Sequence, residues 1–112
     1  MNKINSEELK ILAEALKVNL RKMRLSSNRI CDQKCIALAD VFRWTRVEKI
    51  SLNYNYIQNE GCMALVGALE INQSIKEIDV SSNPLSAEGK KLLKEKENER
   101  SNLKIKTEKF NY

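Results

Sequence analysis

The chain has 112 residues, of which 42% are hydrophobic and 31% are charged, as expected for one small globular domain. It contains no histidine and therefore lacks the commonest general base and the commonest metal ligand. No stretch approaches the roughly 18 consecutive apolar residues of a membrane-spanning helix. The net charge of +5 is concentrated at the C-terminal end, because residues 90–112 hold eight basic and four acidic residues.

The cysteines and the N-terminus predict a cytoplasmic protein. An odd number of cysteines, three in all, in a chain without an export signal favours reduced thiols. The first ten residues, MNKINSEELK, lack the apolar core of a signal peptide. Cys31, Cys35 and Cys62 form no CxxC pair, and we therefore predict no metal site and no cofactor.

Residues 1–19 predict one amphipathic helix. Asn5 is placed as its N-cap, and Glu8, three residues later, completes a capping box. The helix is expected to run to about Val18, with an apolar face made of Leu9, Leu12, Ala13 and Leu16. No strand precedes it, so we interpret it as an incomplete first unit that shields the next helix.

From residue 20 onward, one pattern occurs three times, in residues 20–46, 47–74 and 75–100. Each unit starts with apolar-x-x-apolar-x-apolar-x-x-Asn-x-apolar, which has the period near 2 of a short strand. The asparagines are Asn28, Asn55 and Asn83, which are 27 and 28 residues apart. The second half of each unit has the period of an amphipathic helix.

The helical half of the unit is apolar in the first two copies and becomes charged in the third. The inner faces are predicted to be Cys35, Leu38, Ala39 and Phe42 in the first, and Ala64, Leu65, Ala68 and Leu69 in the second. In the third, Lys96 and Glu97 replace the last apolar pair, and residues 94–100 are all charged except Asn98. We interpret this run as a solvated helix end with no further unit to cover it.

Residues 101–112 predict a closing strand and a tail. Leu103 lies 28 residues after Ile75 and is therefore in register as a fourth strand. Lys104 and Lys106 alternate with its apolar residues and discourage pairing beyond it. Phe110 and Tyr112 are expected to cover the end of the core.

The repeated motif with its asparagine resembles the leucine-rich repeat, and the unit length and helical half resemble the ribonuclease-inhibitor-like class. The resemblance implies one domain over residues 1–112. It would be a short α/β solenoid with parallel strands on the concave side and helices on the convex side. It also implies that Asn28, Asn55 and Asn83 form a structural ladder that bonds to backbone groups at the turns.

Outward-facing strand residues would form columns on the concave face. The predicted protein-binding residues are Lys22, Arg24, Lys49, Ser51, Asn53, Tyr54, Glu77 and Asp79. Ser26, Asn53 and Ser81 form a further predicted column. The face would grade from basic in the first unit to acidic in the third, with Tyr54 as its aromatic residue. The alternative interpretation is that these side chains are simply hydrated.

The leading hypothesis is a non-enzymatic module that holds another protein on its concave face. Relatives in this repeat class include inhibitors, tropomodulin-type actin cappers, innate immune sensors and activators of small GTPases. The alternative hypothesis is a structural subunit of a large cytoplasmic or cytoskeletal assembly. It would dock through the open strand edge at residues 20–25.

Other functions find little support in the residues. The chain has no Ser/His/Asp or Cys/His set and no GxxxxGK[ST] loop, so we do not expect an enzyme. The basic C-terminal end interleaves Glu with Lys and carries no known motif, so we do not expect nucleic-acid binding.

Overall fold

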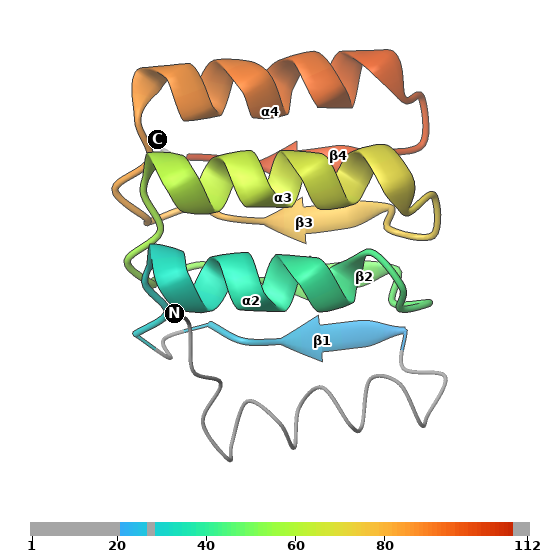
Figure 1. Cartoon of the computed structure of the whole chain (residues 1–112). Helices are drawn as coiled ribbons and strands as arrows, with labels where there is room; N and C mark the ends of the chain where they lie inside the picture. Colours follow the sequence, from blue (N-terminus) through green and yellow to red (C-terminus); the bar gives the residue numbers. More distant parts are fainter. Residues whose placement is uncertain (1–20, 27–28, 109–112) are drawn as a thin grey trace.

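The computed structural model describes residues 21–26 and 29–108. In these residues, four strands alternate with three helices (Figure 1). The elements are β1 (Lys22–Arg24), α2 (Asp32–Phe42), β2 (Lys49–Ser51), α3 (Asn59–Ile71), β3 (Glu77–Asp79), α4 (Ala87–Glu99) and β4 (Lys104–Lys106). The helix predicted in residues 1–19, Asn28, Phe110 and Tyr112 lie outside the described residues.

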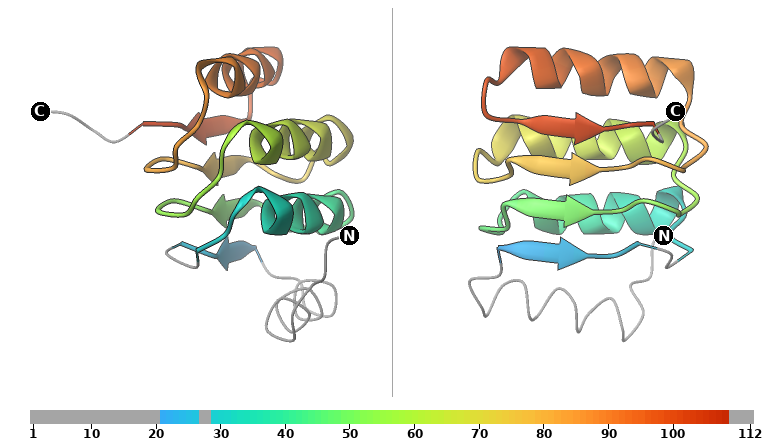
Figure 2. Two further views of the ribbon diagram at one scale, coloured as in Figure 1. Left: turned by 60° about the vertical axis from the view of Figure 1, so that its left-hand side comes forward. Right: turned by 180° about the vertical axis from the view of Figure 1, so that it is seen from behind.

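The four strands form one parallel sheet in the order β1-β2-β3-β4. The helices make a second layer along one face of this sheet, and each lies beside the next (Figures 1 and 2). The α/β solenoid expected from the repeat is therefore confirmed. We call the sheet face away from the helices the concave face.

The core lies between the two layers, because each element turns one apolar side inward. The central residue of every strand is buried, and these residues are Met23, Ile50, Ile78 and Ile105. The predicted inner residues of α2 are all buried as well. In α4 only Gly89 and Leu93 are buried, in keeping with the loss of apolar character in the third unit.

Gly61 lies where the first turn of α3 approaches the preceding unit closely. A Cβ atom at this position would lie 2.7 Å from Asp32 Oδ1 and 2.7 Å from the Cγ2 atom of Ile57. Asp32 Oδ1 is already engaged, since it accepts a 2.7 Å hydrogen bond from the backbone N–H of Gln58. The first turn of α3 therefore fits against α2 only with glycine at this position.

The charged run in residues 94–100 differs from its prediction as a solvated helix end. Glu97 accepts a 2.6 Å hydrogen bond from the backbone N–H of Ile105, and so ties α4 to β4. The Lys96 side chain is only 13% exposed and lies 3.5 Å from Glu70 of the previous helix. Arg100 reaches back to the end of α3. These residues bind neighbouring elements, while Lys94, Glu95 and Glu99 are exposed as predicted.

Candidate protein-binding surface

The turns that follow the strands are built around Asn55 and Asn83. The Asn55 Nδ2 group donates to Leu25 O at 3.0 Å and to Leu52 O at 2.9 Å, and its Oδ1 accepts from Ile30 N at 2.9 Å. Asn83 repeats this arrangement one unit later, with Leu52 O, Val80 O and Ile57 N as its partners. Each side chain thus joins its own turn to the turn before it. This fixes the spacing of the strands that carry the concave face.

The register of the sheet brings the predicted concave residues into columns. One column consists of Lys22, Lys49, Glu77 and Lys104, and the next of Arg24, Ser51, Asp79 and Lys106. The fourth row was missing from the predicted columns, although the alternation of Lys104 and Lys106 with Leu103 and Ile105 could have revealed it.

The fourth row changes the charge distribution of the face. A gradient from basic to acidic was predicted, but the acidic residues Glu77 and Asp79 lie between a basic row and a second basic row on β4. The two columns hold five basic and two acidic side chains. The gradient from basic to acidic therefore runs over the first three rows, as predicted, but the fourth row ends it and gives the two columns a net positive charge.

Asp79 is fixed by a neighbour that was itself predicted to face outward. Its Oδ1 accepts hydrogen bonds from the backbone N–H of Ser81 at 3.0 Å and from the Ser81 hydroxyl at 2.6 Å. Ser81 is only 8% exposed, so it is a buried support and not a part of the face as predicted. Asn53, in the same column, remains partly exposed.

Tyr54 stands at the end of the face in a backbone conformation that is unusual for an aromatic residue. Its φ is 60°, in the left-handed region, and Ser82, 28 residues later, has a φ of 57°. Such a conformation costs a non-glycine residue about 1–3 kcal/mol. The Tyr54 N–H donates to Ser81 O at 3.1 Å, and the residue is half exposed. Tyr56 is exposed just beyond it.

A second set of contacts holds the opposite ends of the units, where the helices finish. The buried Asn72 side chain donates to the carbonyls of Phe42 and Thr45, at the end of α2. Arg100, 28 residues later, donates to Leu69 O at 3.0 Å and to Ile75 O at 2.7 Å. Burial lowers the pKa of its guanidinium. The sequence does carry a signal for these contacts, because a polar residue stands at the same place in two successive units, as Asn72 and as Arg100. Arg100, however, lies within the charged run of residues 94–100, which hid this signal.

The cysteines serve the packing between units. Cys35 and Cys62 are buried and free, and Cys35 Sγ lies 3.6 Å from Gly61 O. Burial, with the charge of Asp32 as a smaller cause, raises the pKa of Cys62 to about 11. Burial also raises the pKa of Cys35. Neither thiol is a ready nucleophile at neutral pH, because both remain protonated.

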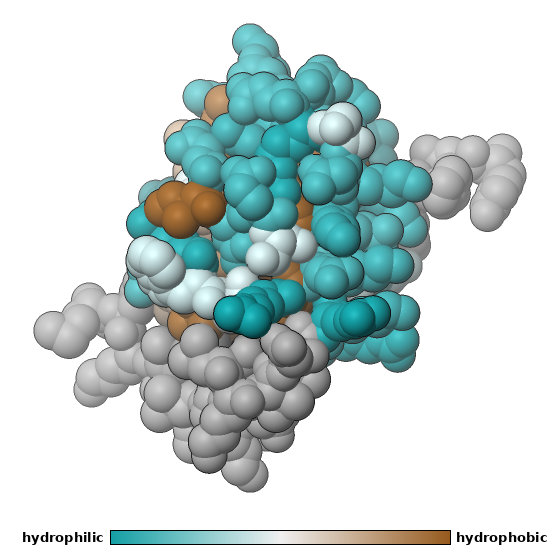
Figure 3. Space-filling view, turned by 90° about the vertical axis from the view of Figure 1, so that its right-hand side faces the viewer, coloured by the Kyte–Doolittle hydropathy of each residue, from teal (hydrophilic) through white to brown (hydrophobic). Residues whose placement is uncertain are grey.

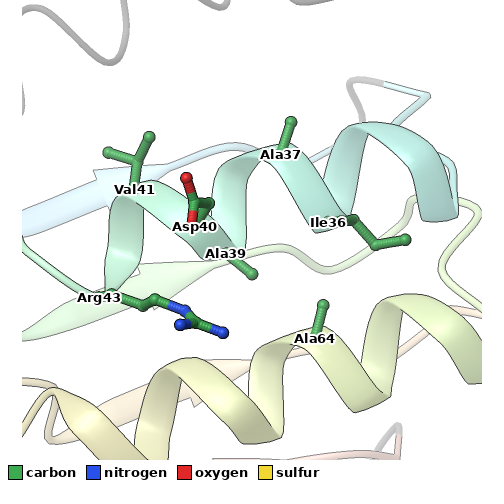
Figure 4. Close-up of a pocket in the computed structure, with 7 residues that line it drawn as sticks. All are labelled: Ile36, Ala37, Ala39, Asp40, Val41, Arg43 and Ala64. Carbon is green, nitrogen blue, oxygen red and sulfur yellow. The ribbon is translucent and has the colours of Figure 1, made fainter. Parts of the chain in front are cut away.

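The convex side carries a shallow cavity of about 370 Å³ over α2 and α3 (Figure 4). Small and branched apolar side chains line most of it, and its charged residues are Asp40 and Arg43. No His/Cys/Asp/Glu cluster suited to a metal ion occurs in residues 21–26 and 29–108. In the same described part of the chain, no helix is long and apolar enough to cross a membrane.

Comparison with known proteins identifies the repeat. The family described as "Leucine Rich repeat" matches residues 47–66 and 72–93. The chain is 30% identical over 83 residues to RAN GTPase-activating protein 2 of Arabidopsis thaliana, a match that covers 72% of this chain and 15% of that protein. It is 32% identical over 77 residues to human NACHT, LRR and PYD domains-containing protein 5, a match that covers 67% of this chain and 6% of the other.

The fold is also found among solved structures. Leiomodin-1 Actin-Binding Site 2 superimposes on 99% of this chain with a TM-score of 0.71, at 16% sequence identity, and 67% of the leiomodin chain is covered. The chain spans only a small part of the length of the two relatives above. Its unit length and its helix in every described unit agree with the ribonuclease-inhibitor-like class. By its repeated motif, its parallel sheet and these matches, the chain belongs to the leucine-rich-repeat proteins.

Proposed function

We propose that this chain is a non-enzymatic protein-interaction module that binds its partner on the concave face. The observation that carries the proposal is the alignment of charged side chains from all four strands into two columns. Turns fixed by Asn55 and Asn83 support these columns. The backbone of the face is thus already ordered before binding, which favours affinity.

The charges of the face favour an acidic partner. Five basic side chains surround two carboxylates in the columns, so an acidic protein surface is attracted and a basic one is repelled. Tyr54 supplies an aromatic anchor at the rim, of the kind that is enriched at interface hot spots. We further propose a cytoplasmic setting, in which the free thiols stay reduced.

The similar proteins support a protein partner without naming one for this chain. One is a GTPase-activating protein, and another contains an actin-binding site. The chain covers only 15% of the first, and its likeness to the second concerns the fold. The proposed interaction therefore rests on the residues of the concave face.

The test is capture of partners from source lysate by the wild-type chain and by two variants with the same charge change. The concave variant carries Lys49→Glu, and the control carries Lys91→Glu on the exposed side of α4. A partner held by wild type and control but lost by the concave variant would support the proposal. Equal capture by all three folded proteins would refute binding at this face.

A second candidate is a structural subunit that docks through the edge of the sheet. Within the described residues, β1 pairs with β2 on one side and with no strand on the other. Such an edge can accept a strand from another chain. Thermal unfolding over a tenfold range of protein concentration tests this candidate. A cooperative transition independent of concentration would argue against an obligate subunit.

A further inference from the structure

Two large apolar side chains lie exposed at the end of the molecule where the helices finish. Trp44 follows α2 and is 70% exposed, and Ile71 ends α3 and is 48% exposed. They occupy equivalent positions 27 residues apart. The segments that carry them are linked, because the Asn72 side chain, next to Ile71 in the chain, bonds to the carbonyls of Phe42 and Thr45, which flank Trp44. Figure 3 faces this end and shows brown and pale side chains beside strongly hydrophilic ones.

A basic cavity of about 380 Å³ opens at the same end, where the strands begin. Arg21, Arg46, Glu48, Ser74 and Lys76 line it. Its walls are adjacent strand starts, since Arg21 O accepts from Glu48 N at 2.9 Å and Glu48 O accepts from Lys76 N at 2.7 Å. Arg46 lies two residues after Trp44, and Ser74 three residues after Ile71, so the segments that line the cavity continue directly from those that carry the apolar pair.

The cavity has more positive charge than its own carboxylate can balance. Glu48 lies 3.8 Å from Lys76, and this pair leaves the positive charges of Arg21 and Arg46 without a balancing carboxylate in the cavity. Both arginines are exposed, and neither has an ion-pair partner among residues 21–26 and 29–108. A guanidinium presents a planar fork of donors that matches a carboxylate in two parallel hydrogen bonds.

The loops that carry these residues are held in place from both sides. Asn72 joins the loop after α3 to the end of α2, and its Oδ1 accepts from Ser74 N at 2.8 Å. Arg100 bonds to carbonyls of the same loop from the next unit, including Ile75 O at 2.7 Å. The apolar pair and the cavity are thus parts of one braced surface, which we call the helix-end surface.

We propose that the helix-end surface, made of Trp44, Ile71 and the cavity with Arg21, Arg46 and Lys76, binds an acidic protein segment. The segment places an apolar side chain on Trp44 and Ile71, and it places an Asp or Glu carboxylate in the cavity. The surface lies at the start of the strands and the ends of the helices, and it uses none of the residues proposed for the concave face. Trp and Arg are the residue types most enriched among interface hot spots.

Trp44 provides the test, because it is the single tryptophan of the chain and its fluorescence reports on this surface alone. The probe is a capped hexapeptide of alternating Leu and Glu, titrated into the full chain at low salt. We expect a saturable shift of the emission to shorter wavelength. The Arg46→Glu variant should weaken the apparent affinity by about tenfold or more, since the carboxylate then faces a like charge. Added salt should weaken it as well.

Three comparisons make the result decisive. Arg24→Glu makes the same charge change on the concave face and should leave the titration unchanged. A Leu and Gln hexapeptide should bind at least about tenfold more weakly, because its amide lacks the charge. Inorganic phosphate should leave the emission unchanged. An absent response, an equal response to the Gln peptide, an equal response to phosphate, or an equal loss in Arg24→Glu would each overturn the proposal.

Discussion

At the scale of single residues, Asn55 shows how one buried polar side chain links two units. It is 5% exposed and satisfies backbone groups of residues 25, 30 and 52, in its own unit and in the unit before it. Its neighbour Tyr54 turns outward in a left-handed conformation. The same short turn thus contains one residue for stability and one for the proposed binding face.

The Asn55→Ala variant should lower the free energy of unfolding by about 3 kcal/mol or more. Buried backbone groups lose their partners, and each such group costs about 1–3 kcal/mol. Urea unfolding of the full chain measures the change. Asn98→Ala, at an exposed position in α4, is the control and should change stability by less than about 1 kcal/mol. Equal losses in the two variants would contradict this assignment of Asn55.

Glu97 should give the chain a specific acid dependence. The hydrogen bond from Ile105 N is the largest cause that lowers the pKa of this carboxyl below the ordinary 4.5, and the contact with Lys94 adds to it. A lowered folded-state pKa stabilises the fold above about pH 4.5, and this stabilisation is lost as the pH falls through the lowered value. In Glu97→Gln, which keeps an oxygen acceptor, stability should change less between about pH 5 and pH 3. Identical pH profiles for the two proteins would exclude this role.

At the scale of the elements, the period of the repeat predicted most of the fold. The motif predicted a short strand at the start of each unit, through Met23, Ile50 and Ile78, and a closing strand near Leu103, and a strand is present at each of these places. This worked because burial alternates along each strand and follows the helical period in α2 and α3. The roles of Glu97 and Arg100 could not be predicted in this way. Their charge predicts that both side chains are exposed to solvent. Only the three-dimensional packing shows which backbone groups they contact.

The two glycines of α3 should respond in opposite ways to alanine. Gly61→Ala places a methyl group 2.7 Å from Asp32 Oδ1 and from Ile57 Cγ2, and should destabilise the chain by about 1–3 kcal/mol. At Gly67 the nearest group is the end of the Arg43 side chain at 3.7 Å, an ordinary contact. Gly67→Ala should therefore stabilise the chain by up to about 1 kcal/mol through helix propensity. Thermal unfolding of both variants decides the point, and shifts of the same sign would refute it.

At the scale of the whole molecule, stability passes from unit to unit. The main links, from Asn55, Asn72, Asn83 and Arg100, each reach back by about one repeat. The packing follows the same rule, because α2 contacts α3 and α3 contacts α4. Such an array opens from its ends, where a unit has one neighbour in place of two. Loss of a terminal link should therefore affect one end of the molecule before the other.

Arg100→Ala tests this directional coupling. Without the guanidinium, the end of α3 loses its bonds to the unit that contains α4 and β4. The Val80 amide donates to Lys106 O, and the Lys104 amide donates to Lys76 O. Both amides should exchange with solvent about tenfold faster in the variant. The Leu25 amide, bonded to Ser51 O at the other end of the sheet, should be affected much less. Equal acceleration at both ends would indicate that the array opens as one body.

The backward reach of these links has a consequence for how such a chain can change in length. A tandem duplication of residues 47–74 would supply a second strand, a second helix and a second copy of both Asn55 and Asn72. Each new copy would contact, in the unit before it, carbonyl and amide groups equivalent to those that the original contacts. The concave face would gain a row with Lys49 and Ser51, and the helix-end surface would gain another Ile71. One genetic event could thus lengthen both proposed binding surfaces while every kind of contact already present is reused.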